Sequence, residues 1–251
     1  MKRILTSLAA AAALSSVTAP ALAQGKDFAT QGTFAFGVER AFGVYIGTRK
    51  LETECPPAPG PGSCEELNHD YTRFSLLVSG PGDDDFGFSG APIPYMSPRV
   101  GFDYFVIDGL SLGGSIGFWS YSEERDIQDK TDGSIGGQED FDHTGFLFSP
   151  RVGYAIMFGD VVGIWPRGGL TFWTDTRDDN RDNVAETDSN EFALTLEFHL
   201  VLVPVEHVGI TIGPVLDFGF AGEMDVPGPF PDPDLHTTNF GIFVAGVFGY
   251  I

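Results

Sequence analysis

The chain has 251 residues, and its 35 acidic and 14 basic side chains give a formal net charge of -21 at pH 7. Its 33 glycines and 17 prolines argue against a helical bundle, and the excess of negative charge argues against binding to nucleic acid. No stretch approaches 18 consecutive apolar residues, which excludes a conventional transmembrane helix.

The first residues read as a secretory signal peptide. Lys2 and Arg3 are followed by an apolar stretch from Ile4 to Leu14, and Ala21-Leu22-Ala23 forms a small-residue cleavage site. The apolar stretch is too short to cross about 30 Å of hydrocarbon as a helix. We therefore expect residues 1–23 to be removed and residues 24–251 to form one exported domain.

The two cysteines, Cys55 and Cys64, both lie in the exported part. In an oxidising compartment they are expected to form a disulfide, which would contribute about 2.5–3 kcal/mol in the chain-entropy model. A metal site is a poorer interpretation: His69 lies close in sequence, but no further pair of ligands accompanies the two thiols. The sequence predicts no cofactor.

The remaining chain alternates between candidate strands and polar segments. The expected strands span about 33–47, 98–107, 110–121, 144–158, 162–174, 191–203, 208–220 and 238–250. The links between them are alternately short and long, and the long ones span about 48–97, 122–143, 175–190 and 221–237. Short turns at one end and long loops at the other are typical of an outer-membrane barrel. The segment from Tyr71 to Ser79 also resembles a strand, so ten strands are an alternative to eight.

Within these strands the large apolar residues occupy even-numbered positions, and the odd positions are small or polar. The pattern is clearest at Phe192, Leu194, Leu196 and Phe198, and in the last strand it places Phe240, Ile242, Val244, Phe248 and Tyr250 on the apolar face. Two faces of different polarity indicate two different solvents. The interior of an eight-stranded barrel is too narrow for so many apolar side chains, so that face should meet lipid. We therefore predict an all-β, eight-stranded antiparallel up-and-down transmembrane β-barrel. The alternative is a soluble β-sandwich, which would show water a face rich in glycine.

The polar face carries charges of both signs. The charges expected in the lumen are Glu39, Arg99, Asp103, Arg151, Arg167, Glu197, His199 and Asp217. Because an unpaired charge in a narrow interior would be costly, we expect these side chains to pair and to plug the lumen. Arg40 fits badly: it occupies an even position, unless a bulge near Glu39-Arg40 turns it inward.

By pattern, about residues 31–251 resemble the small outer-membrane β-barrel proteins, the class that includes the outer-membrane protein A transmembrane domain. The resemblance implies outer-membrane lipid and lipopolysaccharide as surroundings and the barrel-assembly machinery as a partner in biogenesis. The final residue, Ile251, departs from the terminal aromatic of many such barrels. Most of the acidic residues fall in the long loops, which are candidates for weak binding of divalent cations.

The sequence favours a non-enzymatic barrel of structural or interaction type with a charge-plugged lumen. A narrow, porin-like diffusion channel is the alternative, and a lipid-modifying or proteolytic barrel fits less well. No histidine is followed two residues later by serine, as in the barrel lipid A deacylases, and only Asp140, Asp142 and His143 faintly resemble the acid and histidine pairs of the barrel proteases.

Mass spectrometry of the mature chain should show an N-terminus at Gln24 and a Cys55–Cys64 disulfide. An uncleaved N-terminus would contradict export through a cleaved signal, and two alkylatable thiols would contradict the disulfide.

Overall fold

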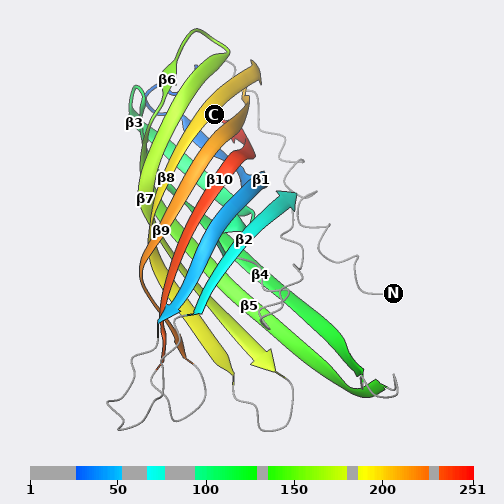
Figure 1. The fold of residues 1–251 in the computed structure, drawn as a ribbon. Helices are drawn as coiled ribbons and strands as arrows, with labels where there is room; N and C mark the ends of the chain where they lie inside the picture. The colour runs from blue at the N-terminus through cyan, green and yellow to red at the C-terminus, as the bar shows by residue number, and fades with distance from the viewer. Residues whose placement is uncertain (1–26, 53–66, 77–93, 129–134, 180–185, 226–231) are drawn as a thin grey trace.

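A computed structural model describes residues 27–52, 67–76, 94–128, 135–179, 186–225 and 232–251 (Figure 1). Almost all of them lie in antiparallel strands. The strands are β1 (Phe34–Glu52), β2 (Leu67–Leu76), β3 (Arg99–Ile107), β4 (Leu110–Gln128), β5 (Ile135–Tyr154), β6 (Ile156–Met157), β7 (Val162–Asp179), β8 (Thr187–Val205), β9 (Val208–Asp225) and β10 (Asp234–Tyr250), and a short 3-10 helix, η2, spans Pro94–Met96. In this part of the chain no helix has the length and apolarity needed to span a membrane.

The strands close into a ring. The pairing runs β1-β3-β4-β5-β7-β8-β9-β10, and β10 pairs in turn with β1. Where the ends of the chain meet, the Phe34 amide donates to the Ile251 carbonyl at 2.9 Å and the Ile251 amide donates to the Phe34 carbonyl at 3.0 Å. The predicted eight-stranded antiparallel barrel is therefore confirmed.

The two ends of the barrel differ. Tight turns such as Asp108-Gly109, where Gly109 has φ +81°, join the strands at one end, which we call the short-turn end. It lies at the top of Figure 1, near the C-terminus. We call the opposite end the long-loop end. There the strands continue beyond the expected boundaries: β4 reaches Gln128, β5 begins at Ile135, and this hairpin projects away from the barrel (Figure 1).

The possible extra strand, β2, adds no position to the ring. It pairs with β1 along Phe42–Leu51, whereas β3 pairs with the same edge of β1 along Phe34–Glu39. The two strands thus share one edge, one after the other, and η2 lies in the chain between them. Cys55 and Cys64 lie outside the described residues, so their disulfide stays a prediction.

The side chains face as the alternation predicts over most of the barrel. On the outside, Phe102 is 39% exposed and Leu196 is 45% exposed, whereas Ser115 and Thr195 are buried inside. A closed ring with its large apolar side chains outside leaves no second sheet to cover them, which contradicts the soluble sandwich. The outer face is suited to lipid.

The last strand departs from the expected facing. The β9–β10 register shifts between Gly241 and Val244, and Phe243 has a left-handed φ of +53°. Beyond this bulge, the expected lipid-facing residues Val244, Phe248 and Tyr250 are buried in the interior. The prediction for these three was wrong because a bulge inserts one residue and reverses the facing of those that follow.

Apolar side chains fill both ends of the described interior. Near the short-turn end, Phe28 lies inside the barrel with ring centroids 5.2 Å from Phe105, 5.4 Å from Trp165 and 5.0 Å from Phe248. We call this cluster the short-turn apolar layer. Toward the long-loop end a second cluster includes Tyr45, Tyr95, Met96, Trp119 and Trp173, and we call it the long-loop apolar layer.

Single cysteines test the facing. At Phe102, Leu196 or Ile212 they should react with lipid-soluble probes and resist aqueous reagents, because these side chains lie on the outer face. At Ser115 or Thr195 the preference should weaken or reverse. Labelling yields in liposomes measure both sets, and aqueous reactivity at the first three positions would contradict the membrane assignment.

Candidate functional site: the charged interior

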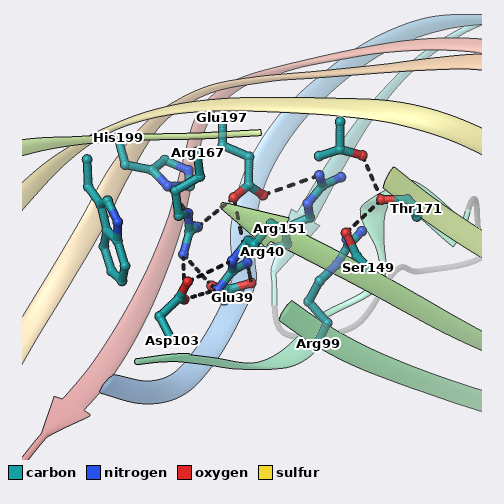
Figure 2. Close-up of polar contacts among 12 residues, drawn as sticks. Glu39, Arg40, Arg99, Asp103, Ser149, Arg151, Arg167, Thr171, Glu197 and His199 are labelled. Atoms are coloured by element: carbon teal, nitrogen blue, oxygen red, sulfur yellow. Dashed lines mark hydrogen bonds and ion pairs between the residues drawn. The ribbon is translucent and has the colours of Figure 1, made fainter. Parts of the chain in front are cut away.

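The eight charged residues predicted for the lumen lie between the two apolar layers. They come from six strands around the ring: β1, β3, β5, β7, β8 and β9. Figure 2 shows most of them pointing toward one another across the interior. We call this set, together with Arg40, the charge layer.

Arg151 and Glu39 form the centre of the charge layer. The Arg151 guanidinium donates from Nη1 and Nη2 to the two Glu39 carboxylate oxygens, both at 2.6 Å. Its Nη2 also lies 2.5 Å from Asp103 Oδ2. Glu39, Asp103 and Arg151 belong to three different strands, so one arginine ties three parts of the wall together. Two parallel N–H···O bonds to one carboxylate fix this geometry more tightly than a single contact could.

Arg167 extends the layer to the next strand. Its Nη1 lies 2.7 Å from Glu39 Oε1, and its Nη2 lies 2.7 Å from Glu197 Oε2. The same Nη2 is 3.0 Å from His199 Nδ1. Because a guanidinium can only donate, Nδ1 must accept, which makes His199 the neutral Nε2–H tautomer. The Arg167 guanidinium also stacks on Trp165, with its Cζ 4.8 Å from the ring centroid, at the boundary of the short-turn apolar layer.

Arg40 points inward, although it occupies an even position. It has φ +53° and lies in an irregular stretch of the β1–β10 pairing between Val38 and Phe42. This bulge turns two consecutive side chains, Glu39 and Arg40, into the lumen. The Arg40 guanidinium binds Asp217 through both nitrogens, at 2.7 and 2.9 Å, and is 3.5 Å from Glu197. Asp217 also accepts from Thr195 Oγ1 at 2.8 Å and Asn239 Nδ2 at 2.9 Å.

Arg99 is buried in the layer but has a different role. Unlike Arg40, Arg151 and Arg167, it has no carboxylate within ion-pair distance among the described residues, and it donates instead to the Tyr95 carbonyl at 3.3 Å. Arg40 donates to the same carbonyl. Two arginines therefore hold the backbone of η2 inside the barrel.

The side chain of Tyr95 anchors η2 to the far wall. Its hydroxyl donates to Glu191 Oε2 at 2.8 Å, and the same carboxylate accepts from Trp173 Nε1 at 3.2 Å and the Thr237 amide at 2.6 Å. Tyr95 is fully buried. Tyr95 thus connects Arg40 of β1 and Arg99 of β3 with Glu191 of β8, on the long-loop side of the charge layer.

Glycines make room for these large side chains. A Cβ at Gly101 would lie 2.5 Å from Glu39 Cδ, one at Gly219 would lie 1.9 Å from Glu191 Oε1, and one at Gly145 would lie 2.1 Å from the Trp119 ring. Real Cβ atoms do not approach so closely, so the bulky side chain and the glycine fit together as a pair. The glycine-rich inner face is therefore the counterpart of the charged and aromatic residues.

Of the residues with a faint likeness to protease chemistry, the two whose side chains are described, Asp142 and His143, point to opposite faces of the wall. His143 points inward and its Nδ1 lies 3.5 Å from Asp175 Oδ2, while Asp175 accepts from Trp119 Nε1 at 2.7 Å. Asp142 points to the outside, and the side chain of Asp140 lies outside the described residues. In the described ranges no group of three or more His, Cys, Asp and Glu side chains could hold a metal ion.

A closed ring with an apolar outer face and a paired, charged interior identifies the fold. The chain has the fold of the small outer-membrane β-barrel proteins. No protein-family model matches it, and no curated protein matches it.

Solved structures of such barrels resemble it over most of their length. Outer membrane protein AlkL shares 13% identity, with 92% of this chain and 95% of AlkL covered and a TM-score of 0.47. OprG from Pseudomonas aeruginosa shares 11%, with 88% and 97% covered and a TM-score of 0.43. Ail, the attachment invasion locus protein of Yersinia pestis, shares 10%, with 87% and 99% covered and a TM-score of 0.35.

The sequence prediction omitted several residues that complete the interior. Arg40 was left out of the predicted set, but the bulge near Glu39-Arg40 that was considered as a way to turn it inward is confirmed. The predicted set also gave a signal, because its three arginines faced four carboxylates and so lacked one cation. Glu191 also carried one, since it is the first residue of the expected strand 191–203 and lies at an odd position, but it was counted with the loop acids. Tyr95 and Phe28 carried none, because neither the 3-10 helix nor the N-terminal turn follows a strand periodicity.

Replacing Arg151 with alanine should destabilise the barrel by roughly 3–5 kcal/mol, because Glu39 and Asp103 would lose a buried partner. Water entering to solvate them would also let ions pass, so conductance should rise as stability falls. Urea unfolding in detergent micelles and planar-bilayer recording measure the two effects.

Arg177→Ala is the matched control, since it removes an arginine of β7 that lies outside the charge layer. Unchanged unfolding and unchanged conductance in Arg151→Ala would show that Arg151 does not hold the layer together.

Proposed function

We propose that this protein is a non-enzymatic outer-membrane barrel of structural or interaction type, with a lumen closed by the charge layer. The observation that carries the proposal is the engagement of all four carboxylates of that layer by Arg40, Arg151 and Arg167 at short distances. A passage for solutes needs side chains that water can solvate, whereas these four carboxylates are buried and paired with arginines.

Three consecutive features along the axis support a closed interior. Phe28 and its aromatic neighbours fill the short-turn end. The charge layer comes next along the axis, and Tyr95 and Met96 lie on its long-loop side. A solute crossing the barrel would have to displace apolar groups at two levels and separate ion pairs at a third. The work of such a barrel would then be done by its outer wall and its long-loop end.

Under this proposal, export delivers the chain to the barrel-assembly machinery, and lipid and lipopolysaccharide surround the finished barrel. The acidic segments at the long-loop end would carry any weak divalent-cation binding. A narrow diffusion channel is the competing function, and it requires an interior that opens under conditions in which the barrel stays folded.

Planar-bilayer recording of purified wild-type protein tests the proposal. We expect no steady conductance, because every carboxylate in the charge layer is paired. The Arg151→Ala protein in the same bilayers shows that inserted barrels are being detected. Large and steady conductance in the wild type would instead make the protein a diffusion channel.

A further inference from the structure

The outer wall of β1 and β10 carries an ordered series of side chains near the long-loop end. Going toward that end, the directly paired residues are Ile46 with Phe240, Thr48 with Thr238, Lys50 with His236, and Glu52 with Asp234. The intervening residues face inward: Leu51, Leu235, Thr237 and Asn239 are all buried. The outward pairs therefore change from apolar to hydroxyl, then to basic, then to acidic.

This series lies where the apolar outer face ends. Ile46 and Phe240 are 46% and 42% exposed and belong to the lipid-facing band, as do Phe218 and Phe220 of the neighbouring strand β9. Residues two apart on a strand are separated by about 6.6–6.8 Å. The basic pair thus stands about 13 Å further along the strands than the last apolar pair, beyond the end of the apolar band.

The wall is hollowed on both sides of the series. One hollow of about 450 Å³ is lined by residues of β1, β2 and β10, including Ile46, Asp70 and Thr72. A second of about 390 Å³ is lined by residues of β1, β9 and β10, including Lys50, Phe218 and His236. Thr48 and Thr238 line both hollows, so the two adjoin the hydroxyl pair.

The chemistry of the hollows selects one class of occupant. Phe218, Phe220 and Ile46 suit acyl chains, and Lys50 with His236 suits a phosphate group. Asp70, which accepts from Thr48 Oγ1 at 2.6 Å, would repel a phosphate but can accept hydrogen bonds from the hydroxyls of a sugar. With a chain net charge of -21, a basic pair at this level is a local exception.

We propose that this face of β9, β10, β1 and β2 binds a phosphorylated glycolipid of the outer leaflet. The acyl chains lie over the apolar pair and Phe218, the sugar lies against Thr48, Thr238 and Asp70, and the phosphate lies at Lys50 and His236. This inference rests on the proposed placement in the outer membrane and names a lipid partner for the outer wall. It is independent of whether the lumen conducts.

Native mass spectrometry of the full barrel, released from detergent and titrated with lipid A, tests the site. The wild type should retain one lipid. Lys50→Gln together with His236→Gln should weaken retention at least about fivefold, the value expected for the lost lysine charge. Glu52→Gln with Asp234→Asn should strengthen it, because these carboxylates stand next to the phosphate position. If the outward pairs had only a structural role, Glu52→Gln with Asp234→Asn would give no gain in affinity for lipid A.

Arg177→Gln is the control for a change of net charge, and it should leave binding unchanged. Two further lipids separate the parts of the proposal. Equal retention of dephosphorylated lipid A would overturn the phosphate site, and equal retention of phosphatidylglycerol would overturn the sugar site. Circular dichroism confirms that each variant is folded. Loss of lipid in a barrel that still does not conduct separates this site from the closure of the lumen.

Discussion

The rest of the structure depends on the pairing of charges in an interior enclosed by the ring of strands. Charged side chains there cannot be hydrated at low cost, so each needs an ion-pair or hydrogen-bond partner within the barrel. Glu39, Arg151 and Asp103 meet from three strands, and Glu197 connects Arg167 with Arg40. Strand register, the bulges and the placement of glycine all bear on this requirement, because Arg40, Arg151 and Arg167 must each reach a carboxylate within hydrogen-bond distance.

Two bulges on adjacent strands make the arrangement possible. On β1 the irregular stretch turns Arg40 inward, and on β10 the bulge at Phe243 turns Val244, Phe248 and Tyr250 inward. The first supplies the cation that Asp217 and Glu197 need. The second supplies aromatic rings that pack around Phe28 at the short-turn end. A regular alternation of side chains would have sent all of these groups into lipid.

Period-two alternation was sufficient to predict the ring, the facing over most of it and every member of the charge layer except Arg40, because each strand separates two environments. The alternation gave the wrong facing where a bulge interrupts the period, as at Phe243. Nothing in the sequence of β10 indicates that this residue has a positive φ. The extension of β4 and β5 beyond the apolar band was also missed, because strands in water need no apolar face. The inward position of Tyr95 could not be predicted, because it depends on contacts with Arg40, Arg99 and Glu191, which come from other segments of the fold.

The fit between glycine and large side chains in the interior limits how the sequence can change over time. At Gly145, for example, any side chain would overlap the Trp119 ring, so the glycine can be replaced only if Trp119 becomes smaller as well. Gly101 stands in the same relation to Glu39. In related sequences these pairs should therefore vary together, with an enlarged residue on one strand matched by a reduced one on another. The wall would thus evolve by compensated double substitutions, while outward positions facing lipid remain free to exchange one apolar residue for another.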